Sequence, residues 1–305
     1  MQMNSTTKVV TTLAAMLLGT VGTAIAAEGY APSELAESVS ADSAVQALVP
    51  ATIAERGVLN ISVYGNTPYT MVNEGGDLYG AVVDLGHALA ATMGLNATVE
   101  DNASVGASKV AVQSGRYDIG MGPFLDSPSA EEDFSIINWI AVTPGIVFRA
   151  GETFTEALDF CGHSIAIVSG SVPVERNMEA MKTACTEAGL PEQTVDAYGD
   201  QNATVVAVLS GRNDGAMMGS ASALYVAKTQ ADKLDAYNAA SDIFGVGLFS
   251  GLGVPIENVD LTAAVEAAMQ SLHASGTYEA ILADYGVEAL MVDEVVVNPI
   301  TSAAK

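Results

Sequence analysis

Apolar residues recur along the chain in two alternating patterns, one typical of strands and one of helices. Val58 to Tyr64 is predicted to form a strand, and from about Val82 to Met93 apolar side chains recur at helical spacing until Gly94 ends the helix. Further apolar strands are predicted at 144–148, 165–168 and 246–249. Strands that alternate with helices predict an α/β fold with largely parallel sheets, whose ligand site lies beyond the carboxyl ends of the strands.

Helices are also predicted on both sides of this strand region. A leading helix is expected from Ser33, as its N-cap, to about Leu48, because Pro50 cannot continue it. Near the C-terminus, Asp260 and Thr277 are the expected N-caps of two consecutive helices.

One nine-residue stretch occurs twice. Residues 110–118 read VAVQSGRYD, and residues 206–214 read VAVLSGRND, which places the copies 96 residues apart. Each copy is predicted to end a helix at its glycine, to turn, and to enter a buried strand at 119–122 or 215–218. This separation is too long for a solenoid period and predicts one helix–turn–strand unit in each of two α/β lobes.

The N-terminus has the pattern of a secretory signal. Lys8 precedes an apolar run from Val9 to about Ile25, and the run ends in the small-residue pattern Ala24-Ile25-Ala26. This predicts a cleavable signal peptide over residues 1–26 and export to the periplasm, with a membrane anchor as the alternative. No later stretch is apolar for long enough to span a bilayer.

The charge balance narrows the range of partners. The 305 residues include 36 acidic and 11 basic side chains, a net charge of −25, and no cluster of Lys and Arg interrupts the acidity. Nucleic acid is excluded as a partner, because the phosphate backbone requires a basic face. The acidity itself is typical of solubility or a saline habitat.

Cysteine and histidine usage predicts no metal site and no cofactor. Cys161 and Cys185 are the two cysteines, and after export an oxidising compartment favours their pairing as a disulfide over a metal or catalytic role. The three histidines, His87, His163 and His273, lie far apart without ligand spacing.

Several short motifs follow one another in a fixed order along most of the mature chain. They are residues 48–51 leading through 57–59 into the first strand, 68–69, 80–85, 114–118, 169–171 and 276–281. In this order they resemble the polar-amino-acid-type solute-binding proteins (family 3) of ABC importers. The resemblance implies a two-lobed periplasmic binding protein-like fold of type II, the Venus-flytrap fold, with two hinge strands. Cys161 and Cys185 also resemble the second-lobe disulfide of one branch of that family.

The resemblance implies a domain organisation and a mode of action. The expected parts are the signal peptide 1–26, an N-terminal helical extension 27–54, lobe 1 from 55–142 plus 246–296, lobe 2 from 143–245, and a tail 297–305 that is flexible after about Asn298. Hinge closure would enclose a small-molecule ligand, and a monomer would present it to an ABC transporter permease in the inner membrane. Two alternatives are a periplasmic sensor subunit and an enzyme evolved on the same scaffold.

Two charged anchors of the family are missing at the matching positions. The family Arg that holds the ligand α-carboxylate corresponds to Ala130, and the second-lobe Asp that receives the α-amino group falls near Gly219. A standard α-amino acid held by these anchors is therefore not expected, because a buried zwitterion without counter-charges is costly. Arg149 and Arg176 stay open as replacement cations, although Arg149 follows a strand and is expected to face solvent.

The residues at the other matching positions are apolar, aromatic or hydroxylic. The candidate ligand-binding residues are Tyr64, Asn66, Tyr69, Gly122, Phe124, Leu125, Ser127, Ser171, Val172, Gly219 and Ser220. Ser171 is expected to open a helix, and Asp126 with aromatic side chains is an alternative site for an organic cation. Tyr64, Phe124 and Trp139 can equally be core residues. An enzyme is not expected, because the nearest acids, Asp126, Glu131 and Glu175, have no His or Lys close by in sequence.

Overall fold

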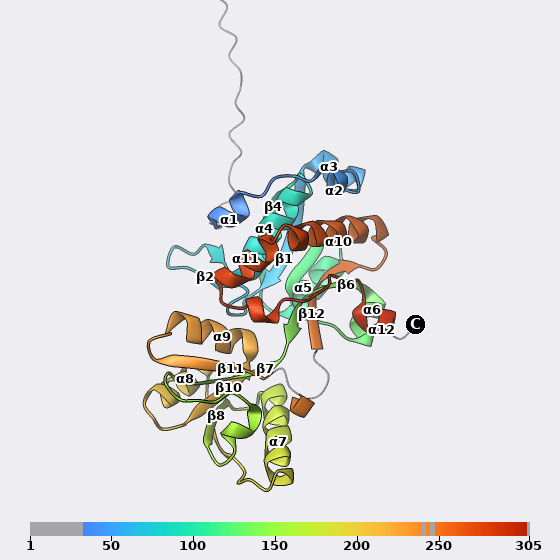
Figure 1. The fold of residues 1–305 in the computed structure, drawn as a ribbon. Coiled ribbons are helices and arrows are strands. Elements are labelled where there is room, and N and C mark those ends of the chain that lie inside the picture. The colour runs from blue at the N-terminus through green and yellow to red at the C-terminus, as the bar shows by residue number, and fades with distance from the viewer. Residues whose placement is uncertain (1–32, 240–241, 245–247, 304–305) are drawn as a thin grey trace, which may run out of the picture.

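The computed structural model describes residues 33–239, 242–244 and 248–303, and it contains two five-stranded sheets in separate lobes (Figure 1). The sheet of the first lobe has the order β4 (Asn96–Asn102), β1 (Val58–Tyr64), β5 (Ile119–Leu125), β12 (Leu248–Pro255) and β6 (Phe134–Val142). The sheet of the second lobe has the order β11 (Leu234–Asn238), β7 (Pro144–Arg149), β10 (Gly215–Gly219), β8 (Ser164–Val168) and β9 (Thr194–Tyr198). The predicted signal peptide, residues 1–26, lies outside the described residues.

Both sheets are mixed, whereas the sequence predicted largely parallel ones. β1 pairs in parallel with β4 and β5, and β8 pairs in parallel with β9 and β10. The strands next to the two connections between the lobes run the other way: β12 is antiparallel to β5 and β6, and β7 is antiparallel to β10 and β11. The chain passes from β6 to β7 through Thr143 and returns from β11 to β12. These two connections give the type II arrangement with two hinge segments.

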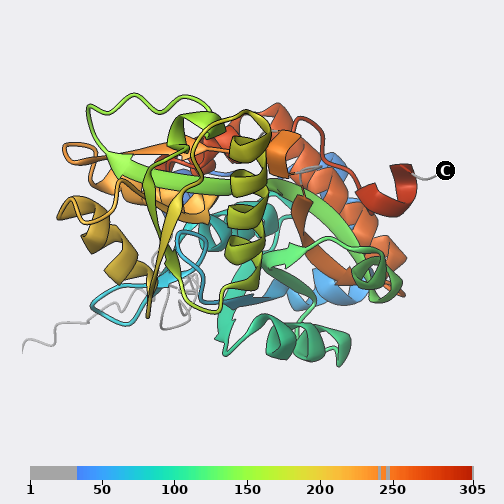
Figure 2. The same ribbon diagram turned by 90° about the horizontal axis from the view of Figure 1, so that it is seen from below.

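The helices cover both faces of the two sheets. They are α1 (Glu34–Glu37), α2 (Ser43–Gln46), α3 (Ala51–Arg56), α4 (Ala81–Thr92), α5 (Val105–Gln113), α6 (Pro128–Asp133), α7 (Val172–Glu187), α8 (Gln201–Leu209), α9 (Ser220–Thr229), α10 (Val259–Ala274), α11 (Thr277–Asp284) and α12 (Pro299–Ala303), with a two-stranded ribbon of β2 (Met71–Val72) and β3 (Leu78–Tyr79) before α4. Figure 2 shows α7, in yellow-green, lying across the strands of the second lobe. No helix of the described residues is both long and apolar enough to cross a membrane.

Local capping changes several predicted helix ends. The expected leading helix is divided in two, because Asp42 caps a new helix by accepting a hydrogen bond from the backbone N–H of Ala44. Asp260 lies in the first turn of α10, whose N-cap is Asn258. Thr277 is the first residue of α11 and follows Gly276, which takes a left-handed conformation with φ of 76°.

The repeated stretch places the same aspartate at the same point of each lobe. The Asp118 carboxylate accepts a hydrogen bond from the Asn60 N–H at 2.8 Å, near the start of β1. The Asp214 carboxylate accepts hydrogen bonds from the Ser164 N–H and hydroxyl, both at 2.9 Å, at the start of β8. In each lobe the aspartate therefore fixes the beginning of a central strand.

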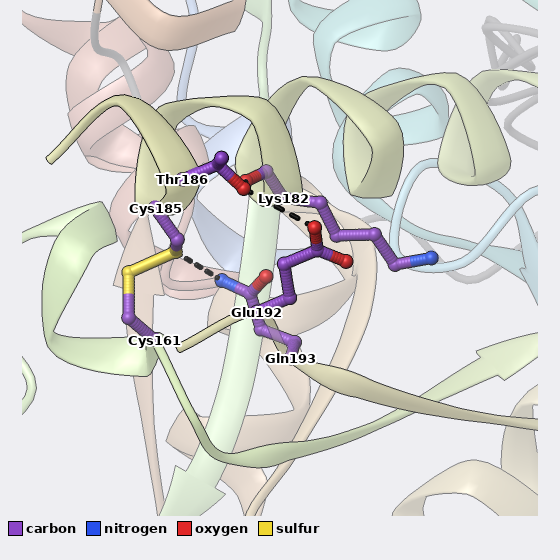
Figure 3. Close-up of a disulfide and its surroundings, with 6 residues drawn as sticks. All are labelled: Cys161, Lys182, Cys185, Thr186, Glu192 and Gln193. Atoms are coloured by element: carbon purple, nitrogen blue, oxygen red, sulfur yellow. Dashed lines mark hydrogen bonds between the residues drawn. A yellow bond between two sulfur atoms is a disulfide. The ribbon is translucent and has the colours of Figure 1, made fainter. Parts of the chain in front are cut away.

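The predicted disulfide between Cys161 and Cys185 is confirmed, and it joins the turn before β8 to α7 (Figure 3). Cys185 is fully buried, and Gln193 donates a hydrogen bond to its sulfur at 3.0 Å. The crosslink thereby ties α7 to the sheet of the second lobe.

The C-terminal segment contacts the first lobe up to the start of α12, in the region where the sequence predicted a flexible tail after about Asn298. Asn138 on the edge strand β6 exchanges backbone and side-chain hydrogen bonds with Glu294 and Val296. The Glu131 carboxylate accepts hydrogen bonds from two backbone N–H groups, of residues 300 and 301, at the start of α12. This pairing covers an otherwise free sheet edge, a common protection against aggregation.

Candidate functional site

A pocket of about 230 Å³ lies between the two lobes. The first lobe supplies the ends of β1 and β5, the loop after β1, and the start of β12, and the second lobe supplies the start of α9. The lining residues are Tyr64, Asn66, Tyr69, Leu125, Ala141, Val142, Thr143, Gly219, Ser220, Ala221, Ser222 and Ser250. None of the described residues that line the pocket carries a charge. The pocket can therefore recognise a ligand through hydroxyls, amides and aromatic rings.

Tyr64 forms one wall of the pocket because glycine at 122 leaves space for its ring. A Cβ atom at Gly122 would overlap that ring, so a larger residue there would displace it. The Tyr64 ring lies nearly parallel to that of Phe124, with 6.4 Å between the ring centroids. Burial raises the pKa of Tyr64 to about 12, which keeps the phenol neutral, and Asn66 hydrogen-bonds to it.

Tyr69 forms a second aromatic surface and is largely part of the core. Its side chain is 6% exposed and meets Trp139 edge to face, with centroids 5.4 Å apart. Trp139 and Phe124 are fully buried, so these two aromatic candidates belong to the core of the first lobe. Burial also raises the pKa of Tyr69. The rings that reach the pocket are therefore neutral and well anchored.

Polar groups at the hinge connect the pocket to both crossings of the chain. The Thr143 hydroxyl lies 2.8 Å from the Ser220 hydroxyl and 2.7 Å from the side-chain oxygen of Asn238. Thr143 has one hydroxyl proton and the amide oxygen can only accept, so Thr143 donates to Asn238 and Ser220 donates to Thr143. The Ser220 N–H also donates to the Thr143 carbonyl at 2.9 Å. The first residue of α9 is thus fixed to the hinge.

The beginning of α9 opens into the pocket without a side-chain cap. Its N-cap is Gly219, and the Ala221 and Ser222 N–H groups belong to the first helical turn, which has no partners within the helix. Such N–H groups and the positive end of the helix favour a carboxylate or carbonyl oxygen of a ligand. This wall of the pocket therefore offers donors although it has no cation.

Six of the eleven candidate residues line the pocket, and five lie elsewhere. Tyr64, Asn66, Tyr69, Leu125, Gly219 and Ser220 are the six. Of the others, Gly122 supports a ring, Phe124 is in the core, and Ser127 caps α6 by accepting from the Ala130 N–H at 3.1 Å. Ser171 and Val172 begin α7, where Val172 is 72% exposed and faces a separate groove of the second lobe.

The sequence did not indicate the residues that the hinge brings to the pocket. These are Ala141, Val142, Thr143, Ala221, Ser222 and Ser250. They are small or apolar and have no motif of their own, and Ser250 reaches the site only because β12 lies between β5 and β6. The one available signal was position, since Ala221 and Ser222 directly follow two predicted candidates.

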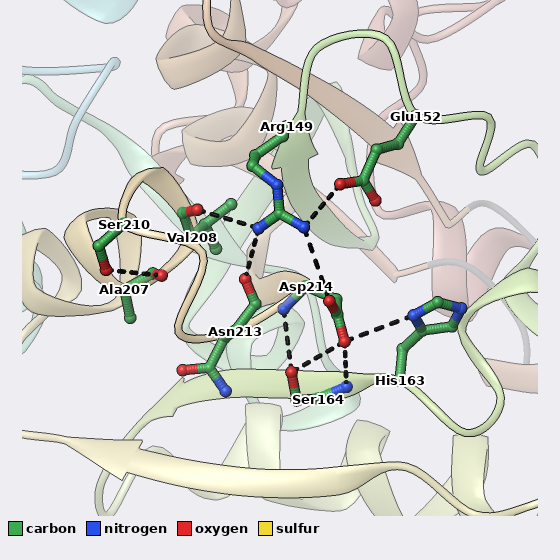
Figure 4. A network of polar contacts seen from close by, with 9 residues as sticks. All are labelled: Arg149, Glu152, His163, Ser164, Ala207, Val208, Ser210, Asn213 and Asp214. Carbon is green, nitrogen blue, oxygen red and sulfur yellow. Dashed lines mark hydrogen bonds and ion pairs between the residues drawn. The ribbon is translucent and has the colours of Figure 1, made fainter.

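Neither candidate replacement cation lines the pocket. Arg149, which was expected to face solvent, is 31% exposed; its guanidinium donates to the backbone oxygens of Val208 and Asn213 and pairs with Glu152 at 2.6 Å (Figure 4). Arg176 lines the groove beside α7. Ala130, which the sequence pattern matched to the family Arg, is 5% exposed and packs in the core.

Asp126 is buried next to the pocket and does not line it. Its side chain is 2% exposed, and burial followed by the nearby charge of Glu131 raises its pKa to about 7. The carboxyl is therefore not placed as a counter-charge for a ligand. Across residues 33–303, apart from the two undescribed gaps, no three His, Cys, Asp or Glu side chains are grouped to hold a metal ion.

The two sheets, the two crossings and the pocket between the lobes define a two-lobed binding protein of type II. The model of the bacterial extracellular solute-binding proteins, family 3, matches residues 59–288, and the chain belongs to this family.

Known relatives share both the sequence pattern and the fold. The arginine-binding protein ArgT of Corynebacterium glutamicum is 27% identical over 258 residues, which cover 83% of this chain and 82% of the relative. A polar amino acid ABC uptake transporter substrate-binding protein from Streptococcus thermophilus has a TM-score of 0.66 at 15% identity, covering 79% of this chain and 90% of that structure. An ancestral cyclohexadienyl dehydratase has a TM-score of 0.55 at 20% identity, with 77% and 94% covered.

Proposed function

We propose that this protein is the extracytoplasmic solute-binding component of an ABC importer, which captures a small polar solute by hinge closure. The observation that carries this proposal is the uncharged pocket to which both lobes contribute. A signal peptide over 1–26 would deliver the chain to the periplasm, where it acts as a monomer and meets a permease of the inner membrane. Lobe 1 would comprise 55–142 plus 246–296, after an extension at 27–54, and lobe 2 would comprise 143–245.

The pocket chemistry favours a nitrogenous solute of no net charge over a charged amino acid. A cationic or anionic ligand would lose its hydration without gaining a counter-charge from the lining residues, and this is unfavourable by several kcal/mol. Tyr64 and Tyr69 offer ring faces, the hydroxyls offer acceptors, and the beginning of α9 offers N–H donors. The relative named for arginine makes arginine the necessary comparison.

Binding without chemistry is the function that the pocket supports, although related scaffolds include a dehydratase. General acid–base catalysis requires a titratable side chain within hydrogen-bond reach of the substrate. The lining residues contain neither a carboxylate nor a histidine, and their two phenols are held neutral by burial. A reaction therefore has no proton donor or acceptor of suitable pKa there.

A thermal-shift screen of the ligand-stripped mature protein tests this function. The panel includes arginine, other amino acids, polyamines, betaines, ectoines and small sugars. A specific ligand at about 100 times its Kd stabilises by about 2.7 kcal/mol, which raises Tm by roughly 5 °C or more. We expect the strongest shift from a solute without net charge.

Matched variants separate binding in this pocket from binding elsewhere. Leu125→Trp fills the pocket from a residue that is 46% exposed, and Leu190→Trp makes the same change at a residue that is 42% exposed and outside the pocket. The ligand shift should disappear in the first variant and persist in the second. A strong shift with arginine, or equal loss in both variants, would contradict the assignment.

A further inference from the structure

Helix α9 lines the pocket with its first turn and also contacts the first lobe. It belongs to the second lobe by its packing on β7 and β11, and Figure 1 shows it on the side that faces the first lobe. Ala221 is 7% exposed and is part of the apolar core of the first lobe, and Leu224 packs against the same core. One helix therefore touches both the ligand site and the opposite lobe.

Two polar contacts fix α9 to the first lobe at separate points. Near the pocket, the Ser222 hydroxyl donates to the Thr67 carbonyl at 3.0 Å. At the far end of the helix, the Lys228 ammonium donates to the Ala283 carbonyl. Ala283 lies in the last turn of α11, where the carbonyl end of the helix dipole favours a cation.

The first lobe has space for Lys228 at one glycine. Gly286 follows α11 with φ of 70°, in the left-handed region that favours glycine. A Cβ atom there would also lie 2.6 Å from Cδ of Lys228. The lysine side chain thus fits a position of the other lobe that no larger residue can occupy without displacing it.

We call the arrangement of the lobes in this structure open, because its pocket lacks part of the predicted ligand-binding residues. Ser171 and Val172 at the start of α7 do not line the pocket, and Val172 is exposed. To place them over an enclosed solute, the second lobe must rotate about the two crossings, one of which is Thr143 beside the beginning of α9.

Such a rotation displaces the contact between Lys228 and Ala283 more than the contact between Ser222 and Thr67. Lys228 lies eight residues after Ser220, or about 12 Å along the helix axis. A rotation of about 15° at the crossings moves a point at that distance by roughly 3 Å, more than a hydrogen bond tolerates. Ser222, close to the crossings, moves much less.

We propose that Lys228 is a positioning residue that holds the lobes in the open arrangement through the end of α11, and that its contact breaks when the lobes close. The proposal rests on the proposed function in one respect, since closure serves to enclose a solute. A solute then has to bind the closed form tightly enough to overcome this contact, and Lys228 tunes affinity from outside the pocket.

Distance measurement between the lobes of the ligand-free protein tests this role directly. Spin labels are attached to cysteines introduced at Glu132 and Glu187, two exposed positions on different lobes. Pulsed electron paramagnetic resonance then gives the distribution of distances between the two labels. Lys228→Met removes the charge, and Lys228→Arg retains it. Lys233→Met is the control, because this exposed lysine of the same lobe has no contact with the first lobe among the described interactions.

We expect Lys228→Met to raise the ratio of closed to open molecules by roughly two- to fivefold, the range of a cation at a helix end. Lys228→Arg should retain most of the wild-type distribution, and Lys233→Met should reproduce it. Gly286→Ala, which crowds the lysine, should shift the ratio in the same direction as Lys228→Met. An unchanged distribution in Lys228→Met, or a shift to longer distances, overturns the proposal. No solute is added, so this outcome is independent of whether the thermal-shift screen finds a ligand.

Discussion

Replacement of Asp126 by asparagine should make the protein more stable at high pH and leave its stability nearly unchanged at low pH. Asp126 is 2% exposed, and burial and the charge of Glu131 raise its pKa from 3.8 to about 7. At pH values between these two pKa values, Asp126 keeps its proton in the folded protein and has lost it in the unfolded chain. The free energy of unfolding therefore falls as the pH rises through this interval, and the contribution of the protonated carboxyl is lost above about pH 7.

The size of the effect follows from the same interval. One pKa unit corresponds to about 1.4 kcal/mol, so the rise in the pKa of Asp126 limits its effect on the free energy of unfolding to about 4 kcal/mol. Relaxation of the surrounding groups and water entry reduce such penalties, and we expect Asp126→Asn to gain about 2 kcal/mol over wild type at pH 8. That gain is roughly 4 °C in Tm. At pH 4.5 the neutral carboxyl and the amide are nearly equivalent, and the two proteins should unfold together.

Thermal unfolding at pH 4.5, 6, 7 and 8 measures this difference. Asp133→Asn is the matched control, because Asp133 is exposed at the end of the same helix α6 and the substitution removes the same charge. The control corrects for the net charge of −25, which affects every pH titration of this chain. A stability gain in Asp126→Asn that is constant across the pH range, or equal to that of Asp133→Asn, refutes the reasoning.

Three further predictions concern the pocket and the second lobe. Joint replacement of Cys161 and Cys185 by alanine should lower the free energy of unfolding by roughly 3 kcal/mol, and an unchanged urea midpoint would contradict this. Gly122→Ala should be less stable by about 1–3 kcal/mol, because its Cβ overlaps an aromatic ring, whereas Gly199→Ala, with open space around it, should change Tm little. Asp214→Ala should cost about 2 kcal/mol and speed amide exchange in β8; equal exchange in both proteins would exclude its anchoring role.

Local patterns in the sequence were sufficient for much of the fold. The strand Val58–Tyr64 and the end of α4 before Gly94 follow from apolar spacing and glycine, which act over a few residues. The repeated stretch indicated one equivalent unit in each lobe, and the structure has those units with their aspartates in the same role. Helix ends were less accurate: α10 begins two residues before the predicted start after Asp260, and its N-cap Asn258 makes no side-chain capping hydrogen bond that a sequence pattern could indicate.

The sequence by itself predicted the two-lobed class and the disulfide, and both are confirmed; that the two charged anchors are missing at their matching positions stays a prediction. The tertiary structure decided the mixed strand pairing, the docking of the C-terminal segment, and the composition of the pocket. Thr143 and Ser250 meet there only because strands distant in sequence pair at the hinge, and Lys228 touches the other lobe for the same reason. Short-range propensities determine which segments are helices or strands. A site between lobes depends on contacts between segments that are far apart along the chain, and no local sequence pattern indicates which of them meet.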